Sequence, residues 1–311
     1  MRRHTGPTAA SARLPGPWRH RSVSANGIQL HVAEAGDGPL VVLVHGFPEF
    51  WWAWRHQLAA LAEAGFRAAA VDLRGYGDSD KPPRGYDLWT LAGDVAGLVR
   101  ALGESRAHVV GHGWGGLIAW TVAALHPRLV ASVVAVAAPH PLALRSAAVS
   151  DVGRQGRAVA RYALGFQLPR WPEHSLRKAG AARVERIMRD WAGVRWVRSP
   201  DFREAVTRYR QAMLVPGVAH CAMEYYRWAL RSQLRAEGRR FASAVARPTD
   251  VPVLQIHGAD DPCVSIDTVH GARRWTGPAH RVDVLPATGH FPHEERPDEV
   301  TRLLVEFLGA R

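Results

Sequence analysis

The stretch at residues 107–117, Ala-His-Val-Val-Gly-His-Gly-Trp-Gly-Gly-Leu, constrains the fold more than any other part of the chain. An apolar run leads into a glycine-rich corner, and an apolar pattern with helical spacing follows from Leu117. This order predicts a buried strand, a very sharp turn and a helix. Gly111 and Gly115 suit such a turn because its flanking residues must lack bulk. The middle residue, which the turn pushes outward at the end of the strand, is Gly113, and it has no side chain.

Strands and helices alternate on both sides of this turn. Two alternating runs joined by Asn26-Gly27 predict a hairpin over residues 22–32. The remaining expected strands cover residues 40–45, 68–73, 107–110, 130–137, 251–256 and 281–285. The expected helices cover residues 54–64, 89–102 and 297–308, together with the helical pattern that starts at Leu117. Such alternation predicts an α/β fold with a doubly wound, mostly parallel sheet, to which the hairpin adds antiparallel strands at one edge.

The pattern changes at Pro139-His140-Pro141 and returns only after Arg247-Pro248. Between these points the sequence shows helical patterns and no strand of the core type. We therefore expect a disordered tail at residues 1–21, a first core part at 22–140, an inserted helical cap, or lid, at 141–248, and a second core part at 249–311. We expect Trp191 and Trp196 in this cap to serve only as packing residues.

The positive charge of the chain is concentrated in this middle segment. Residues 141–250 contain 21 lysines and arginines against 9 aspartates and glutamates, whereas the rest of the chain has 19 of each. This excess favours an arginine-rich solvated surface and leaves an anionic partner as the alternative. No recognised nucleic-acid motif accompanies it.

Several classes of protein are disfavoured by composition. No apolar run is long enough to span a bilayer. Cys221 and Cys263 form no CxxC pattern, so neither a disulfide framework nor a metal site is expected, and a cytoplasmic location follows as the default. The sequence leaves a homodimer open.

Four stretches in order resemble the epoxide hydrolase type of the α/β-hydrolase superfamily. They are His45-Gly46-Phe47-Pro48-Glu49, Asp72-Leu-Arg-Gly-Tyr-Gly-Asp-Ser79, the corner at 111–116 and Gly289-His290-Phe291. The resemblance runs from about residue 22 to the C-terminus. It identifies the corner as a nucleophile elbow and implies an α/β-hydrolase fold acting on a small apolar epoxide without a cofactor or metal.

The resemblance also assigns roles to residues around the elbow. The backbone N–H groups of Phe47 and Trp114 would form an oxyanion hole, and Pro48 would follow a cis bond, as is frequent in the family. His290 would be the general base, and Asp261 would orient it, with Asp260 as the alternative.

The family's cap supplies two tyrosines that protonate the epoxide oxygen. Tyr162 matches the surroundings of the first, and Tyr226 matches the second, with Tyr225 as the alternative. Trp114, Pro48 and Phe166 would contact the substrate.

The departure from the family is the nucleophile, because epoxide hydrolases of this fold carry an aspartate where this chain has Gly113. Three hypotheses follow. Water activated by His290 attacks the epoxide directly; or the protein is an inactive relative that binds a small molecule; or Gly113 is an introduced change that disarms an epoxide hydrolase.

Overall fold

The computed structural model describes residues 6–163 and 165–310, without the side chains of residues 161–163. Its centre is a sheet of eight strands in the order β1-β2-β4-β3-β5-β6-β7-β8. The strands are β1 (Arg19–Ala25), β2 (Ile28–Ala35), β3 (Leu40–Val44), β4 (Arg67–Val71), β5 (Ala107–His112), β6 (Val130–Val136), β7 (Val253–Gly258) and β8 (His280–Leu285). The six strands from β3 to β8 are mutually parallel, and β2 pairs antiparallel with both β1 and β4. The expected mostly parallel sheet is confirmed.

The turn between β1 and β2 shows why the edge hairpin forms. Asn26 and Gly27 both have positive φ angles, 49° and 79°, which a two-residue hairpin turn of this type requires. Asn26 also donates a hydrogen bond of 2.7 Å from Nδ2 to Asp94 on the neighbouring helix. The hairpin is thereby fixed to the body of the sheet.

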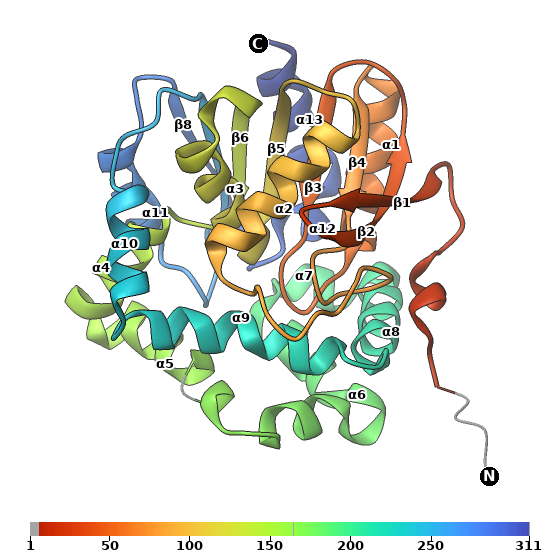
Figure 1. The fold of residues 1–311 in the computed structure, drawn as a ribbon. Coiled ribbons are helices and arrows are strands. Elements are labelled where there is room, and N and C mark those ends of the chain that lie inside the picture. Colours follow the sequence, from red (N-terminus) through yellow and green to blue (C-terminus); the bar gives the residue numbers. More distant parts are fainter. Residues whose placement is uncertain (1–5, 164, 311) are drawn as a thin grey trace.

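Helices cover both faces of the sheet (Figure 1). On the face toward the viewer, α2 (Leu88–Ala101) packs against α3 (Trp114–Leu125). Helices α1 (Arg55–Glu63) and α13 (Pro297–Gly309) pack against each other. Strands β3 and β5, which lie between these helices, are buried throughout because both sheet faces are covered.

The described part of the stretch between β6 and β7 contains helices and no strand of the sheet. In Figure 1 these helices form a layer across one end of the sheet. They are α4 (Pro141–Ser150), η4 (Val152–Gly156), α5 (Arg157–Ala163), η5 (Gly165–Gln167), α6 (Trp171–Trp191, kinked at residues 178–181), α7 (Val194–Val197), α8 (Pro200–Leu214), α9 (Val218–Ser232) and α10 (Ala236–Ala244). The remaining short elements are η1 (Ala9–Ala12), η2 (Trp51–Trp54), η3 (Pro127–Leu129), α11 (Ile266–His270), η6 (Gly271–Trp275) and α12 (Pro292–Glu295).

The expected disordered tail at residues 1–21 is wrong for residues 6–21. Ala12 is buried, and its carbonyl oxygen accepts a 2.7 Å hydrogen bond from Nε1 of the buried Trp51. Arg13 forms an ion pair with Asp78, and β1 already begins at Arg19. The composition of the segment could not predict these contacts, because their partners, Trp51 and Asp78, lie far away in the sequence. Residues 1–5 of that segment lie outside the described residues.

Within the described chain, none of the helices is both long enough and apolar enough to cross a membrane.

Three buried histidines should make the fold sensitive to mild acid. Burial lowers the pKa of His108 to about 4, of His140 to about 3 and of His293 to about 4, so all three are neutral in the folded protein. The unfolded chain takes up these protons near pH 6.5, so the free energy of unfolding falls as the pH drops below 6.5 and is fully present above it. Each histidine contributes a loss of about 2 kcal/mol between pH 7 and pH 5.

Urea titrations at pH 7 and pH 5 test this expectation. His108 bonds to Ser132 at 2.8 Å, and a glutamine can keep that bond without titrating. In His108→Gln the difference in the free energy of unfolding between the two pH values should shrink by about 2 kcal/mol. An unchanged difference would show that His108 does not become protonated on unfolding.

Candidate functional site: a cavity at the elbow

Gly113 joins β5 to α3 in a sharp turn whose backbone conformation glycine adopts readily. Its φ and ψ angles are 51° and −114°. Its N–H donates to Val136 on β6, and its carbonyl oxygen accepts from Leu117 in α3, each at 3.1 Å. The backbone of Gly113 is therefore held by hydrogen bonds at both its N–H and its carbonyl group.

The space around the elbow glycines differs sharply from one to the next. A Cβ atom on Gly111 would lie 2.2 Å from the carbonyl oxygen of Gly115, and one on Gly115 would lie 2.1 Å from that of Val44. Both positions therefore exclude any side chain. A Cβ atom on Gly113 would instead make only ordinary contacts, at 3.7 Å to His290 Nε2 and 3.8 Å to Gly46 Cα. The turn has room for a side chain at position 113.

His290 and Asp261 form a buried pair opposite Gly113. The distance between His290 Nδ1 and Asp261 Oδ2 is 2.8 Å, and Oδ1 of Asp261 accepts hydrogen bonds from the backbone N–H groups of Cys263 and Val264. Burial favours a higher pKa for Asp261, but His290 and the hydrogen bonds outweigh it, and its pKa falls below the usual value. Asp261 is thus a carboxylate that fixes Nδ1 as the protonated nitrogen and leaves Nε2 facing Gly113.

The neighbouring Asp260 does not take part. Its side chain is exposed, and its backbone N–H bonds to Thr288. Asp261, the acid expected to orient His290, is the one that contacts it, and Asp260 does not cap the next helix. Ser265 caps that helix, α11, by accepting a hydrogen bond from Thr268.

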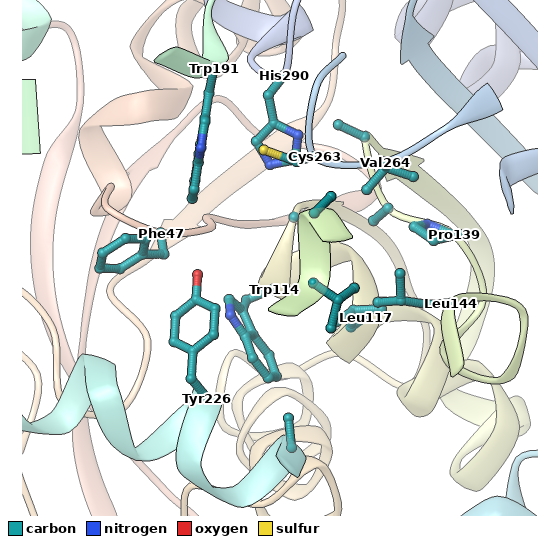
Figure 2. A pocket seen from close by; sticks show the side chains of 16 residues that line it. Phe47, Trp114, Leu117, Pro139, Leu144, Trp191, Tyr226, Cys263, Val264 and His290 are labelled. Carbon is teal, nitrogen blue, oxygen red and sulfur yellow. The ribbon is translucent and has the colours of Figure 1, made fainter. Parts of the chain in front are cut away.

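A cavity of about 200 Å³ opens in front of Gly113 and His290 (Figure 2). Its described lining is mostly apolar, and the lining side chains that carry a polar atom are Trp114, Trp191, Tyr226, Cys263 and His290. The full described lining is Phe47, Gly113, Trp114, Leu117, Ala137, Ala138, Pro139, Leu144, Ala158, Val159, Trp191, Tyr226, Ala229, Cys263, Val264 and His290. The cavity lies between the elbow and helices α4, α5, α6 and α9.

The structure places the two adjacent tyrosines of α9 differently. Tyr226 lines the cavity, and Figure 2 shows its hydroxyl pointing into the space between Phe47 and Trp114. The Tyr225 hydroxyl is buried and donates a 2.7 Å hydrogen bond to the carbonyl oxygen of Arg74. Tyr226 is therefore the tyrosine of this pair that can reach a ligand. The side chain of Tyr162 lies outside the described residues.

The residues expected to contact substrate are only partly brought together. Phe47 and Trp114 line the cavity, and the peptide bond between Phe47 and Pro48 is cis. Phe166 lies behind Tyr226, with ring centroids 4.9 Å apart, and Pro48 is also absent from the described lining. Both were expected to contact substrate, and neither is among the described residues that line the cavity; Phe166 packs against Tyr226, which is.

Trp191 is the clearest residue that sequence reasoning missed. The expectation that it only packs is wrong, because its ring lines the cavity and lies edge-on to His290, with centroids 5.3 Å apart. Its carbonyl oxygen also accepts a 2.8 Å hydrogen bond from the His290 backbone N–H. Leu144, Val159 and Cys263 were missed as well, since no local pattern marks their side chains as facing the elbow.

A second buried cluster lies beneath the elbow. The two nitrogens of His112 lie 2.8 Å from Glu49 Oε2 and from the carbonyl oxygen of His290, so both nitrogens face acceptors. Burial disfavours the charged form of both residues, but Glu49 raises the pKa of His112 above the usual value, and His112 in turn holds the pKa of Glu49 well below its own. The result is a buried imidazolium–carboxylate pair, and Glu49 also accepts from the Gly46 N–H.

Two groups of described residues bring three potential metal ligands within 4.8 Å of one another. They are Glu49, His112 and His293, and Asp261, Cys263 and His290. In each group a histidine nitrogen and a carboxylate already share a 2.8 Å hydrogen bond. These atoms are used for positioning, and a metal would have to break those bonds.

Comparison with known proteins now decides the family. The family model described as the alpha/beta hydrolase fold matches residues 39–297. The chain belongs to this family. An AB hydrolase superfamily protein, YfhM, from Bacillus subtilis is 35% identical over 290 residues, covering 92% of this chain and 96% of the relative. Epoxide hydrolase A from Mycobacterium tuberculosis is 33% identical over 324 residues, covering 93% and 96%.

Solved structures agree with this assignment. The epoxide hydrolase from an endophytic Streptomyces superposes with a TM-score of 0.80 at 30% identity, covering 95% of this chain and 96% of that one. Epoxide Hydrolase A from Mycobacterium thermoresistibile gives a TM-score of 0.78 at 29% identity, covering 94% and 98%. The chain is an epoxide hydrolase-like member of the α/β hydrolase family.

Proposed function

We propose that the protein adds water to a small apolar epoxide, with the water activated directly by His290. One observation carries this proposal. A single apolar cavity holds Nε2 of His290, the open position beside Gly113 and the hydroxyl of Tyr226. These are a base, a place for a nucleophile and an acid.

The reaction balances with these groups alone. Nε2 of His290 takes a proton from a water molecule beside Gly113, and the water oxygen attacks one epoxide carbon. The carbon–oxygen bond of the ring breaks, and the ring oxygen takes the proton of the Tyr226 hydroxyl. The Asp261 carboxylate stabilises the imidazolium formed at His290. Proton return from the imidazolium to the tyrosine, through solvent, restores the site.

The apolar walls support the choice of substrate. The aliphatic and aromatic lining offers few hydrogen-bond partners to a hydroxylated substrate. An apolar epoxide, by contrast, loses little hydration free energy when it leaves water. We take residues 141–248 to be the lid of this site, because Leu144, Val159, Trp191 and Tyr226 all come from them.

The rate of epoxide hydrolysis should be low compared with that of enzymes of this fold that carry a side-chain nucleophile. We take the backbone N–H groups of Phe47 and Trp114 to be an oxyanion hole that would support a covalent ester; in favour of this, both residues line the cavity and the first N–H groups of α3 have no partner within the helix. Without a side-chain nucleophile that ester does not form. Enzymes that lose their nucleophile retain about 10³–10⁴-fold acceleration over water from binding and electrostatics.

Because Gly113 has no side chain, a second candidate function is a protein that binds an apolar small molecule without turning it over. The glycine would then have arisen by descent or through an introduced change at this position. Incubation with a panel of aliphatic and aryl epoxides separates the two. Diol in the medium and no adduct on the intact protein by mass spectrometry supports direct hydrolysis. Measurable binding without diol or adduct supports the binding protein.

Replacing the acid should slow ring opening without unfolding the protein. In Tyr226→Phe we expect the rate of diol formation to fall by about 10²-fold, because general acid catalysis contributes on that scale. The matched control is Tyr225→Phe, which removes a hydroxyl bonded to the Arg74 carbonyl and should change thermal stability more than rate. Equal losses of rate in the two variants would exclude Tyr226 as the acid.

A further inference from the structure

The outer edge of the helical layer between β6 and β7 exposes several large apolar side chains. Residues 145–178 pass through most of α4, then η4, α5, η5 and the start of α6, and in Figure 1 this stretch follows the lower edge of the layer, away from the sheet. Eight large apolar side chains are exposed in the described part of the chain, and four of them lie here: Val149, Val152, Leu168 and Trp171. Val149 is 76% exposed and Trp171 54%. Apolar groups gathered in this way mark an interaction surface.

The same stretch carries positive charge that has no partner. Leaving aside residues 161–164, its arginines and lysines are Arg145, Arg154, Arg157, Arg170, Arg177 and Lys178. All six are exposed, and none of them forms an ion pair among the described contacts. The two acidic side chains of the stretch are already engaged, since Asp151 caps η4 and Glu173 lies 2.7 Å from Arg227. The edge therefore presents free cations beside apolar groups.

Three of these cations share one hollow in the surface. Arg170, Arg177 and Lys178 line a depression of about 470 Å³. Glu173 is the one acidic residue of its described lining, and the ion pair with Arg227 matches its charge. Phosphate groups are bound by clustered arginines and lysines, so the hollow suits a phosphate headgroup.

An anionic lipid surface fits this edge better than a nucleic acid does. Arginine and lysine attract anionic headgroups, while tryptophan and aliphatic side chains enter the boundary between headgroups and hydrocarbon. A nucleic acid would use the cations through its phosphates but would leave Val149, Val152 and Leu168 in water. The mixture of charge and exposed aliphatic groups therefore points to a bilayer.

A second cavity connects this edge with the elbow. It measures about 390 Å³, and its lining includes the exposed Arg145 and Val149, so it reaches the surface within the same stretch. The two cavities adjoin, because they share five lining residues: Trp114, Leu117, Leu144, Val159 and Ala229. An apolar molecule that enters beside Val149 thus has only these side chains between it and the cavity at Gly113.

We propose that residues 145–178 dock the protein on an anionic lipid bilayer, with the cations of the hollow at the headgroups and Trp171 at the boundary below them. Apolar epoxides dissolve in a bilayer, so the docked protein meets them at high local concentration, and the second cavity receives them. The docking stands without the proposed function, whereas this delivery of substrate rests on it.

Sedimentation of the protein with lipid vesicles tests the docking. Vesicles of phosphatidylcholine with phosphatidylglycerol should bind the protein at least about tenfold more tightly than vesicles of phosphatidylcholine alone. Binding should weaken as salt is added, since salt screens exposed charges. Equal binding to both kinds of vesicle, or no binding to the anionic vesicles at low ionic strength, overturns the proposal.

Two variants locate the surface. The triple variant Arg170→Gln/Arg177→Gln/Lys178→Gln should lower binding to anionic vesicles about 100-fold at low salt, because each basic residue near such a surface contributes about fivefold. Trp171→Ala should lower it about tenfold, since the buried apolar area is lost. All four side chains are exposed, so the variants should fold, and melting curves check this.

A matched control separates this edge from the net charge of the chain. The triple variant Arg19→Gln/Arg128→Gln/Arg273→Gln removes the same charge from exposed arginines outside residues 145–178. It should leave binding to anionic vesicles nearly unchanged. An equal loss of binding in this control would overturn the assignment of the docking surface. DNA binding as tight as vesicle binding, with no effect of Trp171→Ala, would make the edge a general polyanion surface and would also overturn the proposal.

Epoxide hydrolysis provides a readout of delivery. The triple variant in the hollow should slow hydrolysis of a long-chain 1,2-epoxyalkane held in anionic vesicles by about as much as it weakens binding. Hydrolysis of styrene oxide dissolved in water should be unchanged. Docking without any diol supports the surface and overturns the proposed function alone. Diol from dissolved styrene oxide without docking overturns the surface alone, and docking that leaves hydrolysis of the vesicle-held epoxide unaffected overturns the delivery.

Discussion

The substitution Gly113→Asp should raise the rate of epoxide hydrolysis by about 10²–10³-fold. The estimate follows from other hydrolases, where loss of the nucleophile costs up to about 10⁶ in rate and the remaining groups retain a part of it. The His290–Asp261 pair and Tyr226 are arranged around position 113, and a Cβ atom there meets only ordinary contacts. The restored carboxylate would attack the epoxide and form an ester, which water activated by His290 would cleave.

The same substitution should cost stability. At φ 51° and ψ −114° a residue with a side chain is strained, by about 1–3 kcal/mol. Hydrogen bonds from the N–H groups of Phe47 and Trp114 would favour the charged form of the new side chain and keep it ionised near neutral pH. We therefore expect a lower melting temperature together with a higher rate.

Steady-state diol formation measures the gain, and Gly113→Asn is the matched control. The asparagine has nearly the same shape and backbone strain but cannot form the ester. It should melt like Gly113→Asp and show no gain in rate. A folded Gly113→Asp variant that binds the epoxide and forms neither diol nor adduct would show that the cavity is not arranged for attack.

Removal of the base should abolish hydrolysis in both backgrounds. In His290→Ala we expect a 10²–10⁴-fold loss of diol formation, because His290 carries the only imidazole among the described residues that line the cavity. In the double variant Gly113→Asp/His290→Ala the first step survives, so an ester adduct with the mass of the epoxide should accumulate on the protein.

Aspartates 261 and 260 provide the control for this prediction. Asp261→Asn should slow diol formation strongly, since the carboxylate that fixes the His290 tautomer is lost. Asp260→Asn should leave the rate unchanged, because Asp260 is exposed and bonds only through its backbone N–H among the described contacts. Diol formation retained in His290→Ala would move the base elsewhere.

Much of this architecture could be read from local patterns. The alternation of apolar strands with helices predicted the mostly parallel sheet, and Asn26-Gly27 predicted its edge hairpin. The glycine corner predicted the turn at Gly113, because only a turn this tight needs glycine at both flanks. The resemblance to the epoxide hydrolase type predicted Asp261 as the aspartate that meets His290.

The rest of the cavity depends on contacts that no local pattern contains. Trp191 ends a helix roughly one hundred residues before His290 in the chain, and its role follows only from how the helices between β6 and β7 pack against the sheet. Phe166 was expected to contact substrate, but its ring packs against Tyr226 and is not among the described residues that line the cavity. Ala12 likewise is held by a bond to Trp51, which composition cannot reveal.

The oxygen of the diol formed in a single turnover tests the proposed chemistry most directly. Protein in excess over an aryl epoxide reacts in H₂¹⁸O, in a chloride buffer free of carboxylates, and the diol is analysed by mass spectrometry. Direct attack by water places ¹⁸O in the diol at the first turnover, whereas Gly113→Asp, as the covalent reference, should deliver an unlabelled oxygen from its own carboxylate. Unlabelled diol from the unmodified protein would mean that one of its own carboxylates attacks, and it would contradict direct hydrolysis.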